Sequence, residues 1–501
     1  MIARISVNRM IVLLLLVFVF LISLHDLTTI NQDIARHLKS GELIWQSKSV
    51  YKTNLFSFTE PDHIFINHHW LSEVIFFSLN KLIGLKALII LKALLISGAF
   101  FIALQSVWEI SPKRYLLPVF LLGLAVFNRT SVRPEIFSYF IFSLFLWVIF
   151  QYKYQNRYKF LYFLPLLQIL WTNFHIYFAL GPGLIFLLLV DRFFHKKEDL
   201  KKISLIFILT GLATLINPNF IRGALAPFSI LREYGYRIVE NQSIFFLSNL
   251  GIFLSDITIF QISLVILAIS ILVALSRKAK GLTLEILILI TFSILGIKMI
   301  RNFGLYSLAL IPSLALVLKS TAIFENLKQK AVLKAVAVTS ALILIGLAGT
   351  GHYWSLRQAN KNFGLTIPIG AGAGVVFLEN NQIEGNVFNN FDVGSFLIWK
   401  RYPEHKVFVD GRPEAYSVNF FEKIYKPMQE DPKIWDKLSE EYDINYIFFA
   451  HTDITPWAQK FLIDISKNKN WPLVYLDNSV AIFLKKTPGN QDLIDRYNTA
   501  N

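Results

Sequence analysis

Long apolar runs dominate the first 350 residues of the chain and are separated by short polar segments. The run from residue 11 to 22 reads IVLLLLVFVFLI, and further runs rich in Leu, Ile and Phe follow it. Because roughly 20 apolar residues cross a bilayer as one helix, these runs predict membrane-spanning helices rather than buried strands. We expect about eleven helices, near residues 9–25, 86–107, 115–129, 136–151, 159–173, 176–191, 203–217, 257–275, 282–298, 302–319 and 331–350.

The pattern changes after residue 351, where charges, Pro and Asn return. Short β-like runs (GNVFNNF, KVFVDGR, NYIFFA and PLVYL) alternate with helical patterns such as residues 431–442. Strands that alternate with helices are typical of an α/β domain. We therefore predict a transmembrane domain over residues 1–350, an α/β domain over 351–490 and a flexible tail over 491–501.

The distribution of Lys and Arg orients the predicted helices. The segments SPKR, YKYQNRYK, RFFHKKEDLKK and SRKAKG lie in alternate loops, and basic loops stay in the cytoplasm. The first apolar run has no small-residue cleavage site before His25, so we expect a retained helix with a cytoplasmic N-terminus. The fold class is therefore an α-helical multi-pass membrane protein, and an odd number of helices makes its C-terminal α/β domain extracytoplasmic.

The first outer loop, residues 25–85, contains a second apolar stretch at 67–85 (NHHWLSEVIFFSLNKLIGL). If this stretch were another crossing, SPKR and YKYQNRYK would lie outside, against the charge rule. Apolar Trp70 and Phe77 alternate with polar Glu73 along it, which suits an amphipathic helix at the membrane interface. We therefore assign it to the outer loop.

The composition limits the chemistry. The 501 residues are 54% hydrophobic and 17% charged, and no cysteine is present. Thiol catalysis, disulfides and Cys-ligated metals are excluded, so carboxylates, His, Arg, Lys or Tyr must act. The net charge of +15 would suit nucleic acid, but the basic excess lies mostly in the cytoplasmic loops. We expect membrane lipids as surroundings and no nucleic acid as partner.

Polar residues at the outer ends of the predicted helices are the candidate site, because a charge at membrane depth costs about 3 kcal/mol. Asp33 lies within two turns of the membrane edge, and Glu135 follows Pro134, where it could also simply favour a helix dipole. The full set is Asp33, His68, His69, Glu73, Arg133, Glu135, Trp171, Asn173, His175, Lys298, Arg301 and Asn302.

Three pairs have an alternative reading. His69 and Glu73 are four residues apart and share a helix face, a spacing that suits a substrate hydroxyl or a divalent metal, although two ligands do not make a metal site. Arg301 beside Asn302 suits a lipid-linked phosphate, or anionic lipid without catalytic purpose. Asp410 and Arg412 (VDGRPEAY) end a predicted strand and either face the site or form a structural turn.

This arrangement resembles the GT-C superfold of polyprenyl-phosphate-dependent membrane glycosyltransferases, such as protein O-mannosyltransferases and the lipid A aminoarabinose transferase. In those enzymes an acid follows the first helix and a second acid lies between helices 3 and 4, where Asp33 and Glu135 stand here. The run from DIARHL to HHWLSEVIF, with WTNFH, INPNF and VFVDGRPEAY, looks like an uncharacterised bacterial subgroup. Asp33 departs from the family's frequent paired-carboxylate motif, and Glu135 replaces a frequent Asp.

The resemblance covers most of residues 10–420 and implies an inverting glycosyltransferase of the bacterial plasma (inner) membrane. Its donor would be a polyprenyl-phosphate sugar and its acceptor a lipid, glycan or protein. Asp33 would be the general base, and Glu135, the second catalytic residue, would with His69 and Glu73 orient donor or acceptor hydroxyls or the base itself. Arg301, helped by Arg133 or Lys298, would meet the leaving phosphate, and the other polar residues would bind substrate.

No cofactor is certain from the sequence, and a divalent metal remains possible. Two other functions stay open. A lipid-linked glycan ligase or polymerase would work at the same face but would transfer a preassembled chain. A transporter or flippase would carry repeat symmetry and broken helices, and no such repeats are visible in the sequence.

Overall fold

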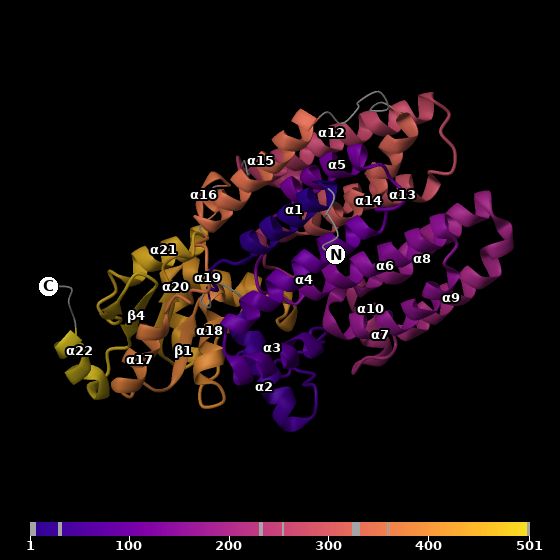
Figure 1. Ribbon diagram of the computed structural model, residues 1–501. Helices are drawn as coiled ribbons and strands as arrows, with labels where there is room; N and C mark the ends of the chain where they lie inside the picture. The colour runs from indigo at the N-terminus through magenta and orange to yellow at the C-terminus, as the bar shows by residue number, and fades with distance from the viewer. Residues whose placement is uncertain are drawn as a thin grey trace. The chain divides into compact units, whose positions relative to one another are not determined.

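The computed structural model describes residues 7–28, 33–229, 234–252, 255–322, 331–357, 359 and 361–497 (Figure 1). The chain divides into two compact units. We call Met1–Asp26, Leu85–Pro227 and Ile238–Thr366 the helical unit, and Leu27–Gly84, Phe228–Arg237 and Ile367–Asn501 the sheet unit.

Each of the eleven apolar segments expected to form a helix contains one. The observed helices are α1 (Val7–Ser23), α4 (Lys86–Gln105), α5 (Lys113–Val126), α6 (Glu135–Gln155), α7 (Leu164–Phe174), α8 (Leu180–His195), α9 (Leu200–Ala213), α12 (Ser255–Ser276), α13 (Thr283–Lys298), α14 (Phe303–Thr321) and α15 (Ala331–Gly349). Of the predicted cytoplasmic segments 1–9 and 319–330, residues 1–6 and 323–330 lie outside the described residues.

Length and hydropathy identify five described spans that could cross a membrane: Lys86–Gln105, Glu135–Gln155, Ile176–His195, Ser255–Ser276 and Ile300–Thr321. Three shorter apolar helices are Val7–Ser23, Tyr115–Val126 and Lys334–Gly349. These apolar helices are those of an integral membrane protein.

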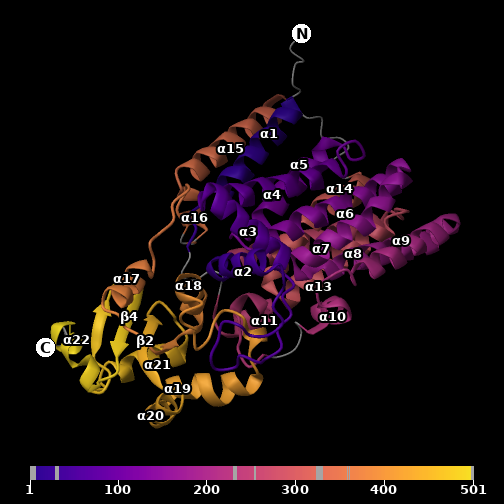
Figure 2. The ribbon, with the colours of Figure 1, turned by 90° about the horizontal axis from the view of Figure 1, so that it is seen from below.

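Helix α14 is the centre of the helical unit. It is buried along nearly its whole length and packs against α4, α5, α6, α12 and α13, while α1 and α15 lie side by side (Figure 2). Small residues let α14 and α5 approach each other closely, so that the Ser307 hydroxyl of α14 donates to the Gly123 carbonyl of α5 over 2.6 Å.

Shorter elements connect the helices of this unit. They are η1 (Tyr158–Phe163), η2 (Ile176–Ala179), η3 (Lys197–Asp199), α10 (Phe220–Ser229), η4 (Val239–Asn241), α11 (Ile244–Asn249), η5 (Ile300–Asn302) and α16 (His352–Leu356).

The sheet unit is built on a four-stranded mixed sheet in the order β1-β2-β4-β3. Its strands are β1 (Asn386–Asn389), β2 (Ile444–Ala450), β3 (Leu473–Leu476) and β4 (Val480–Leu484). β1 and β2 are parallel, and the other pairs are antiparallel. Successive residues of β2 point to opposite faces, with Tyr446 and Phe448 in one core and Ile447 and Phe449 in the other.

Helices cover both faces of this sheet. α17 (Gly372–Asn380) and α18 (Phe391–Arg401) join the first core, and α20 (Pro432–Glu441) and α21 (Pro456–Ile465) join the second. The remaining elements are η6 (Pro413–Ala415), the π-helix η7 (Phe420–Tyr425), α19 (Lys426–Glu430), η8 (Pro488–Asn490) and α22 (Gln491–Tyr497).

Three of the four predicted strands are present, and the prediction for KVFVDGR was wrong. Residues 406–412 form no strand, and Val407 makes only an isolated bridge to Ser57. The strand β4 was not expected. Of the predicted flexible tail, residues 491–497 form α22 with Ile494 buried, and residues 498–501 lie outside the described part.

The first outer loop belongs to the same compact unit as the sheet, whereas the sequence suggested grouping it with the membrane helices. Its two helices, α2 (Ile34–Ser47) and α3 (Trp70–Ile83), pack against each other, and α2 packs on α18. Ala35 and Phe56 belong to one core of the sheet and Phe65 to the other. The loop is thus part of the hydrophobic core of the sheet unit.

Candidate active site

The predicted site residues fall into two groups, one in each unit. The sheet unit contains Asp33, His68, His69, Glu73, Asp410 and Arg412, and the helical unit contains Arg133, Glu135, Trp171, Asn173, His175, Lys298, Arg301 and Asn302. We describe each group by itself.

Asp33 is the residue before the first turn of α2, and its carbonyl accepts the His37 amide over 3.0 Å. Its side chain is 29% exposed. One turn later, Arg36 has Nη2 at 3.7 Å from Asp33 Oδ1 and Nη1 at 3.7 Å from Glu73 Oε1. The buried guanidinium therefore lies between an accessible carboxylate and a hidden one.

Glu73 is the hidden carboxylate and is fully buried. Its Oε1 lies 2.8 Å from His37 Nδ1, and its Oε2 accepts from Asn67 Nδ2 over 2.6 Å. Burial alone would raise the pKa of Glu73, but the hydrogen bonds from His37 and Asn67 and the charge of Arg36 outweigh it and lower that pKa. Burial also lowers the pKa of His37, so a neutral imidazole donates to a charged Glu73.

The sequence placed His69 and Glu73 on one helix face, with a substrate hydroxyl or a divalent metal as their shared ligand, and that role stays a prediction. His69 supplies its carbonyl to the Glu73 amide over 3.0 Å, and its ring stands edge-on to His37 at 5.5 Å. Ser72, Glu73 and Phe76 are the buried residues of α3, while Leu82 near its end is 80% exposed. Glu73 organises the first loop from inside.

His68 lies beside His69 with ring centroids 4.1 Å apart, and its Nδ1 lies 3.0 Å from the Ile66 carbonyl. Within the described part of the chain, no group of three or more His, Asp or Glu side chains is arranged to hold a metal ion.

Asp410 and Arg412 form a fully buried pair. Arg412 Nε donates to Asp410 Oδ1 over 2.7 Å, and Arg412 Nη2 donates to Asp410 Oδ2 over 2.8 Å. The Tyr416 hydroxyl also donates to Asp410 Oδ2, over 2.9 Å. Burial would raise the pKa of Asp410, but Arg412 outweighs it and lowers that pKa. The pair forms a buried turn that has Gly411 at its centre.

Gly411 contacts the accessible carboxylate. A Cβ added to Gly411 would lie 2.9 Å from Asp33 Oδ1 and 3.3 Å from Ser395 Oγ. A side chain at position 411 would therefore have to displace the Asp33 carboxylate.

Two further acids, Glu414 and Asp392, interact electrostatically with Asp33. Burial raises the pKa of Glu414, which feels Arg36, Arg412 and Asp33. Burial, Asp453 and Asp33 raise the pKa of Asp392, in the first turn of α18, to about 6. Glu414 belongs to the VDGRPEAY motif, but nothing in the sequence around Asp392 distinguishes it from a residue favourable to a helix N-terminus.

In the helical unit, Glu135 begins α6 and is bound by Arg129. Arg129 Nε donates to Oε1 over 2.9 Å and Nη2 to Oε2 over 3.1 Å. The remaining arm of Arg129 donates to Glu240 over 2.7 Å, and Arg133 donates to the other oxygen of Glu240 over 2.6 Å. Glu135 is thus a positioned, neutralised carboxylate. Arg129 and Glu240 were not among the predicted residues, because only the fold joins positions 129 and 240.

Arg301 completes the cluster from η5. Its Nε donates to the Tyr177 hydroxyl over 3.1 Å and its Nη1 to Asn241 Oδ1 over 3.0 Å. Burial would raise the pKa of Glu240, but Arg129, Arg133 and Arg301 outweigh it and hold that pKa well below its ordinary value. Three guanidinium groups face two carboxylates here, so the cluster keeps an excess of one positive charge.

The WTNFH residues support Tyr177. The Trp171 indole donates to the Ser138 hydroxyl over 2.8 Å, that hydroxyl lies 3.0 Å from His175 Nδ1, and the His175 ring stands edge-on to Tyr177 at 4.6 Å. Asn173 donates to the carbonyls of Ile169 and Ile216, and Asn302 donates to that of Leu295. Lys298 is exposed. Trp171 and Asn173 thus form hydrogen bonds within the helical unit, and His175 lies against Tyr177.

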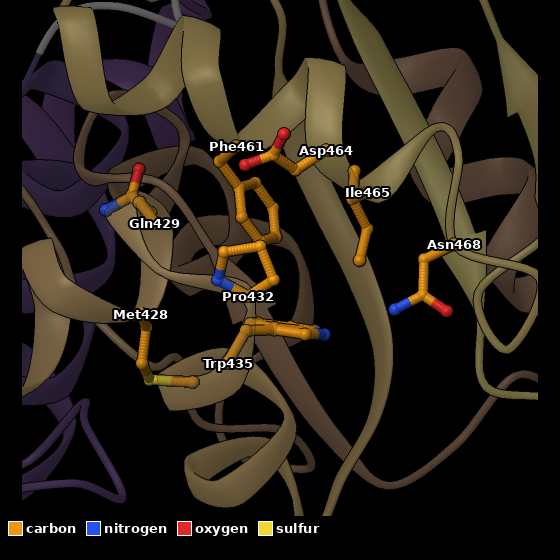
Figure 3. A pocket seen from close by; sticks show the side chains of 8 residues that line it. All are labelled: Met428, Gln429, Pro432, Trp435, Phe461, Asp464, Ile465 and Asn468. Carbon is orange, nitrogen blue, oxygen red and sulfur yellow. The ribbon is translucent and has the colours of Figure 1, made fainter.

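Two pockets of the sheet unit contain none of the predicted site residues. One, of about 20 Å³, is walled by Trp435 and Phe461 with Gln429 and Asp464 at its margin (Figure 3). That volume holds a water molecule rather than a sugar. The other is an open, mainly apolar groove of about 600 Å³ between α17 and β3, lined by residues that include Phe377 and Tyr475.

The chain has the fold of the GT-C membrane glycosyltransferases. It is similar to the arabinofuranosyltransferase AftD from Mycobacteria (TM-score 0.56, 14% identity) over 97% of this chain and 40% of AftD. It is also similar to the oligosaccharyltransferase AglB from Archaeoglobus fulgidus in complex with an inhibitory peptide and a dolichol-phosphate (TM-score 0.51, 12% identity), over 95% of this chain and 74% of AglB. No sequence-family model and no curated protein matches the chain.

Proposed function

We propose that this protein is a membrane glycosyltransferase that moves a sugar from a polyprenyl-phosphate-linked donor to a lipid, glycan or protein acceptor at the outer face of the membrane. The observation that carries the proposal is the fold, shared over nearly the whole chain with two glycosyltransferases. The dolichol-phosphate bound to AglB is a polyprenyl phosphate and supports the donor class. The basic loops support a cytoplasmic N-terminus and an outer sheet unit.

In the proposed reaction, Asp33 is the general base. Its carboxylate is part-exposed, whereas Glu73 and Asp410 are buried and satisfied within the protein. The acceptor hydroxyl attacks the anomeric carbon, Asp33 takes its proton, and the bond from that carbon to the phosphate oxygen breaks. The oxygen keeps the electron pair, and one displacement inverts the anomeric configuration.

The arginine cluster of the helical unit suits the leaving phosphate. Arg301 and Arg133 present guanidinium groups around Glu240, and the cluster has one positive charge in excess. Guanidinium groups recognise phosphate oxygens and stabilise the charge that develops on them. Because Glu135 is neutralised by Arg129, we assign it the role of holding this cluster rather than of accepting a proton.

The testing experiment uses the full chain in reconstituted membranes with a panel of radiolabelled polyprenyl-phosphate sugars and a membrane extract as acceptor source. We expect label transfer with one donor, and loss of it in Asp33→Asn. The matched control is Asp62→Asn, an exposed acid of the same loop, which should transfer normally. Normal turnover by Asp33→Asn would contradict the assignment of Asp33 as the base. If the wild-type protein transferred label from none of the donors, the proposed function would be wrong.

The second candidate is an enzyme that transfers a preassembled glycan, and the likeness to an oligosaccharyltransferase favours it. The same experiment separates the two functions by the size of the product. Transfer of one residue supports the first function, and transfer of a chain from a lipid-linked oligosaccharide supports the second.

A further inference from the structure

The turn Asp410–Gly411–Arg412 is fixed more firmly than a surface turn. The two hydrogen bonds within the Asp410–Arg412 pair are supplemented by one from Arg412 Nη2 to Asn54 Oδ1 over 2.8 Å. The guanidinium also lies between the rings of Phe56 and Phe65, at 5.0 and 4.7 Å from their centroids. Asn54, Phe56 and Phe65 come from the first loop, which also carries Asp33.

A glycine is required at position 411 because there is no room for a Cβ atom, and not because of the backbone conformation. Its φ is outside the left-handed region, so an alanine could adopt the same backbone. The Cβ of that alanine would stand 2.9 Å from Asp33 Oδ1, a distance that real Cβ atoms essentially never show. Its next neighbour is a hydroxyl, Ser395 Oγ at 3.3 Å. The first atom to move would therefore be the carboxylate oxygen.

Two other tight glycines of this unit, Gly394 and Gly41, differ from Gly411 in what they contact. A Cβ on Gly394 would meet the Val409 carbonyl at 2.1 Å, and one on Gly41 would meet the Glu73 carbonyl at 2.0 Å. Those contacts are with backbone, which cannot give way without disturbing the fold. Only at Gly411, among the three, is the nearest atom the carboxylate of the proposed base.

The same oxygen of Asp33 is also held from another direction, because Arg36 Nη2 lies 3.7 Å from it. Arg36 is in turn held near Glu73, which is fixed by His37 and Asn67. Asp33 Oδ1 thus lies between a guanidinium on α2 and the bare Cα of Gly411.

We propose that Gly411 is a positioning residue that lets the Asp33 carboxylate lie in its reactive orientation against the rigid Asp410–Arg412 turn. The inference rests on the proposed function. A base displaced by about an ångström loses roughly 100-fold in rate. Gly411→Ala should therefore lower kcat by roughly 10- to 100-fold and change KM less than about threefold, since donor and acceptor contacts are untouched.

The matched control is Gly489→Ala. Gly489 belongs to the same unit, has no heavy atom within 4 Å of its would-be Cβ, and has an ordinary φ. Gly489→Ala should keep wild-type kcat, and both variants should melt at the wild-type temperature in detergent. Wild-type kcat in Gly411→Ala, or a lowered melting temperature that accompanies its loss of activity, would overturn the positioning role.

A second measurement tests the geometry without activity. The chain has no cysteine, so Asp33→Cys combined with Gly411→Cys gives a single pair of thiols, and the first substitution removes the oxygen that the new side chain would meet. Mild oxidation should close a disulfide and protect both thiols from maleimide. Asp33→Cys with Gly489→Cys should stay reactive. Absence of the cross-link overturns the inference, whereas absence of transfer by the unmodified protein overturns the proposed function.

Discussion

Arg129 and Glu135 form a two-armed ion pair, with nitrogen–oxygen distances of 2.9 and 3.1 Å and a Glu135 that is 2% exposed. This relationship points to a role for Glu135 in holding the arginine cluster, because both arms of the Arg129 guanidinium bind its carboxylate. The pair is therefore tested through stability rather than through chemistry.

Arg129→Met should destabilise the protein strongly, because Glu135 would remain buried without its partner. Breaking a buried pair typically costs about 3–5 kcal/mol, whereas replacing both partners by apolar residues costs much less. Melting in detergent should show a large drop for Arg129→Met and a smaller drop for the double variant Arg129→Met with Glu135→Leu. A double variant that melts below the single variant would contradict this account.

Glu73→Ala should unfold the protein at a lower temperature than Asp33→Asn. Removing Glu73 leaves the polar atoms of His37 and Asn67 buried without a partner, at about 1–3 kcal/mol each. Asp33 is part-exposed, so the Asp33→Asn variant should have a melting temperature close to that of the wild type. Equal melting temperatures for the two variants would show that the inward side of α3 does not organise the loop.

Arg301→Lys should impair the protein nearly as much as Arg301→Ala. The guanidinium donates in two directions, to Tyr177 and to Asn241, and an ammonium on a flexible stem cannot reproduce that fork. In the transfer assay we expect KM for the donor to rise roughly 10- to 100-fold in both variants, about 1.4–2.8 kcal/mol. Lys280→Ala, at an exposed lysine that is not among the candidate residues, serves as the control and should leave KM unchanged. Full activity of Arg301→Lys would show that position 301 needs only a positive charge and not the guanidinium geometry.

Asp392→Asn should stabilise the protein in a pH-dependent manner. Burial, Asp453 and Asp33 raise the folded-state pKa of Asp392 from 3.8 to about 6, so the folded state binds the proton more tightly than the unfolded state. The wild type therefore loses stability as the pH rises from about 4 through about 6, and the loss is complete above that. The asparagine variant should melt higher than the wild type at pH 8, by an amount that shrinks toward pH 4. A gain that is independent of pH would contradict the assignment.

The sequence was most informative where periodicity and length decide structure. Apolar runs such as residues 11–22 form helices because no other structure satisfies a backbone in lipid. KVFVDGR failed as a strand although its pattern alternates, because Val407, Phe408 and Val409 are buried by packing and only Val407 forms a bridge. Local β-preference was overridden there by tertiary contacts.

The sequence indicated several candidate residues but not the partners that they bind. Asp33 and Arg301 stood out because each lies at a predicted membrane edge. Glu73 was selected with His69 from their spacing on one helix face, but that spacing could not reveal its partners His37 and Asn67, which come from outside α3. Arg129 and Glu240 pair across a separation of 111 residues, which no local pattern encodes.

The shared core of the first loop and the sheet has a consequence for synthesis. Ser57 donates to the carbonyl of Phe408 across 351 residues, and Arg412 reaches Asn54 across 358. At roughly 5–20 residues per second, a ribosome needs about 20–70 s to add that much chain. Throughout this interval Phe56 and Phe65 lack the aromatic and aliphatic residues that later bury them. The loop that carries Asp33 must therefore be kept from aggregation, as an incomplete domain, until the last quarter of the chain has been made.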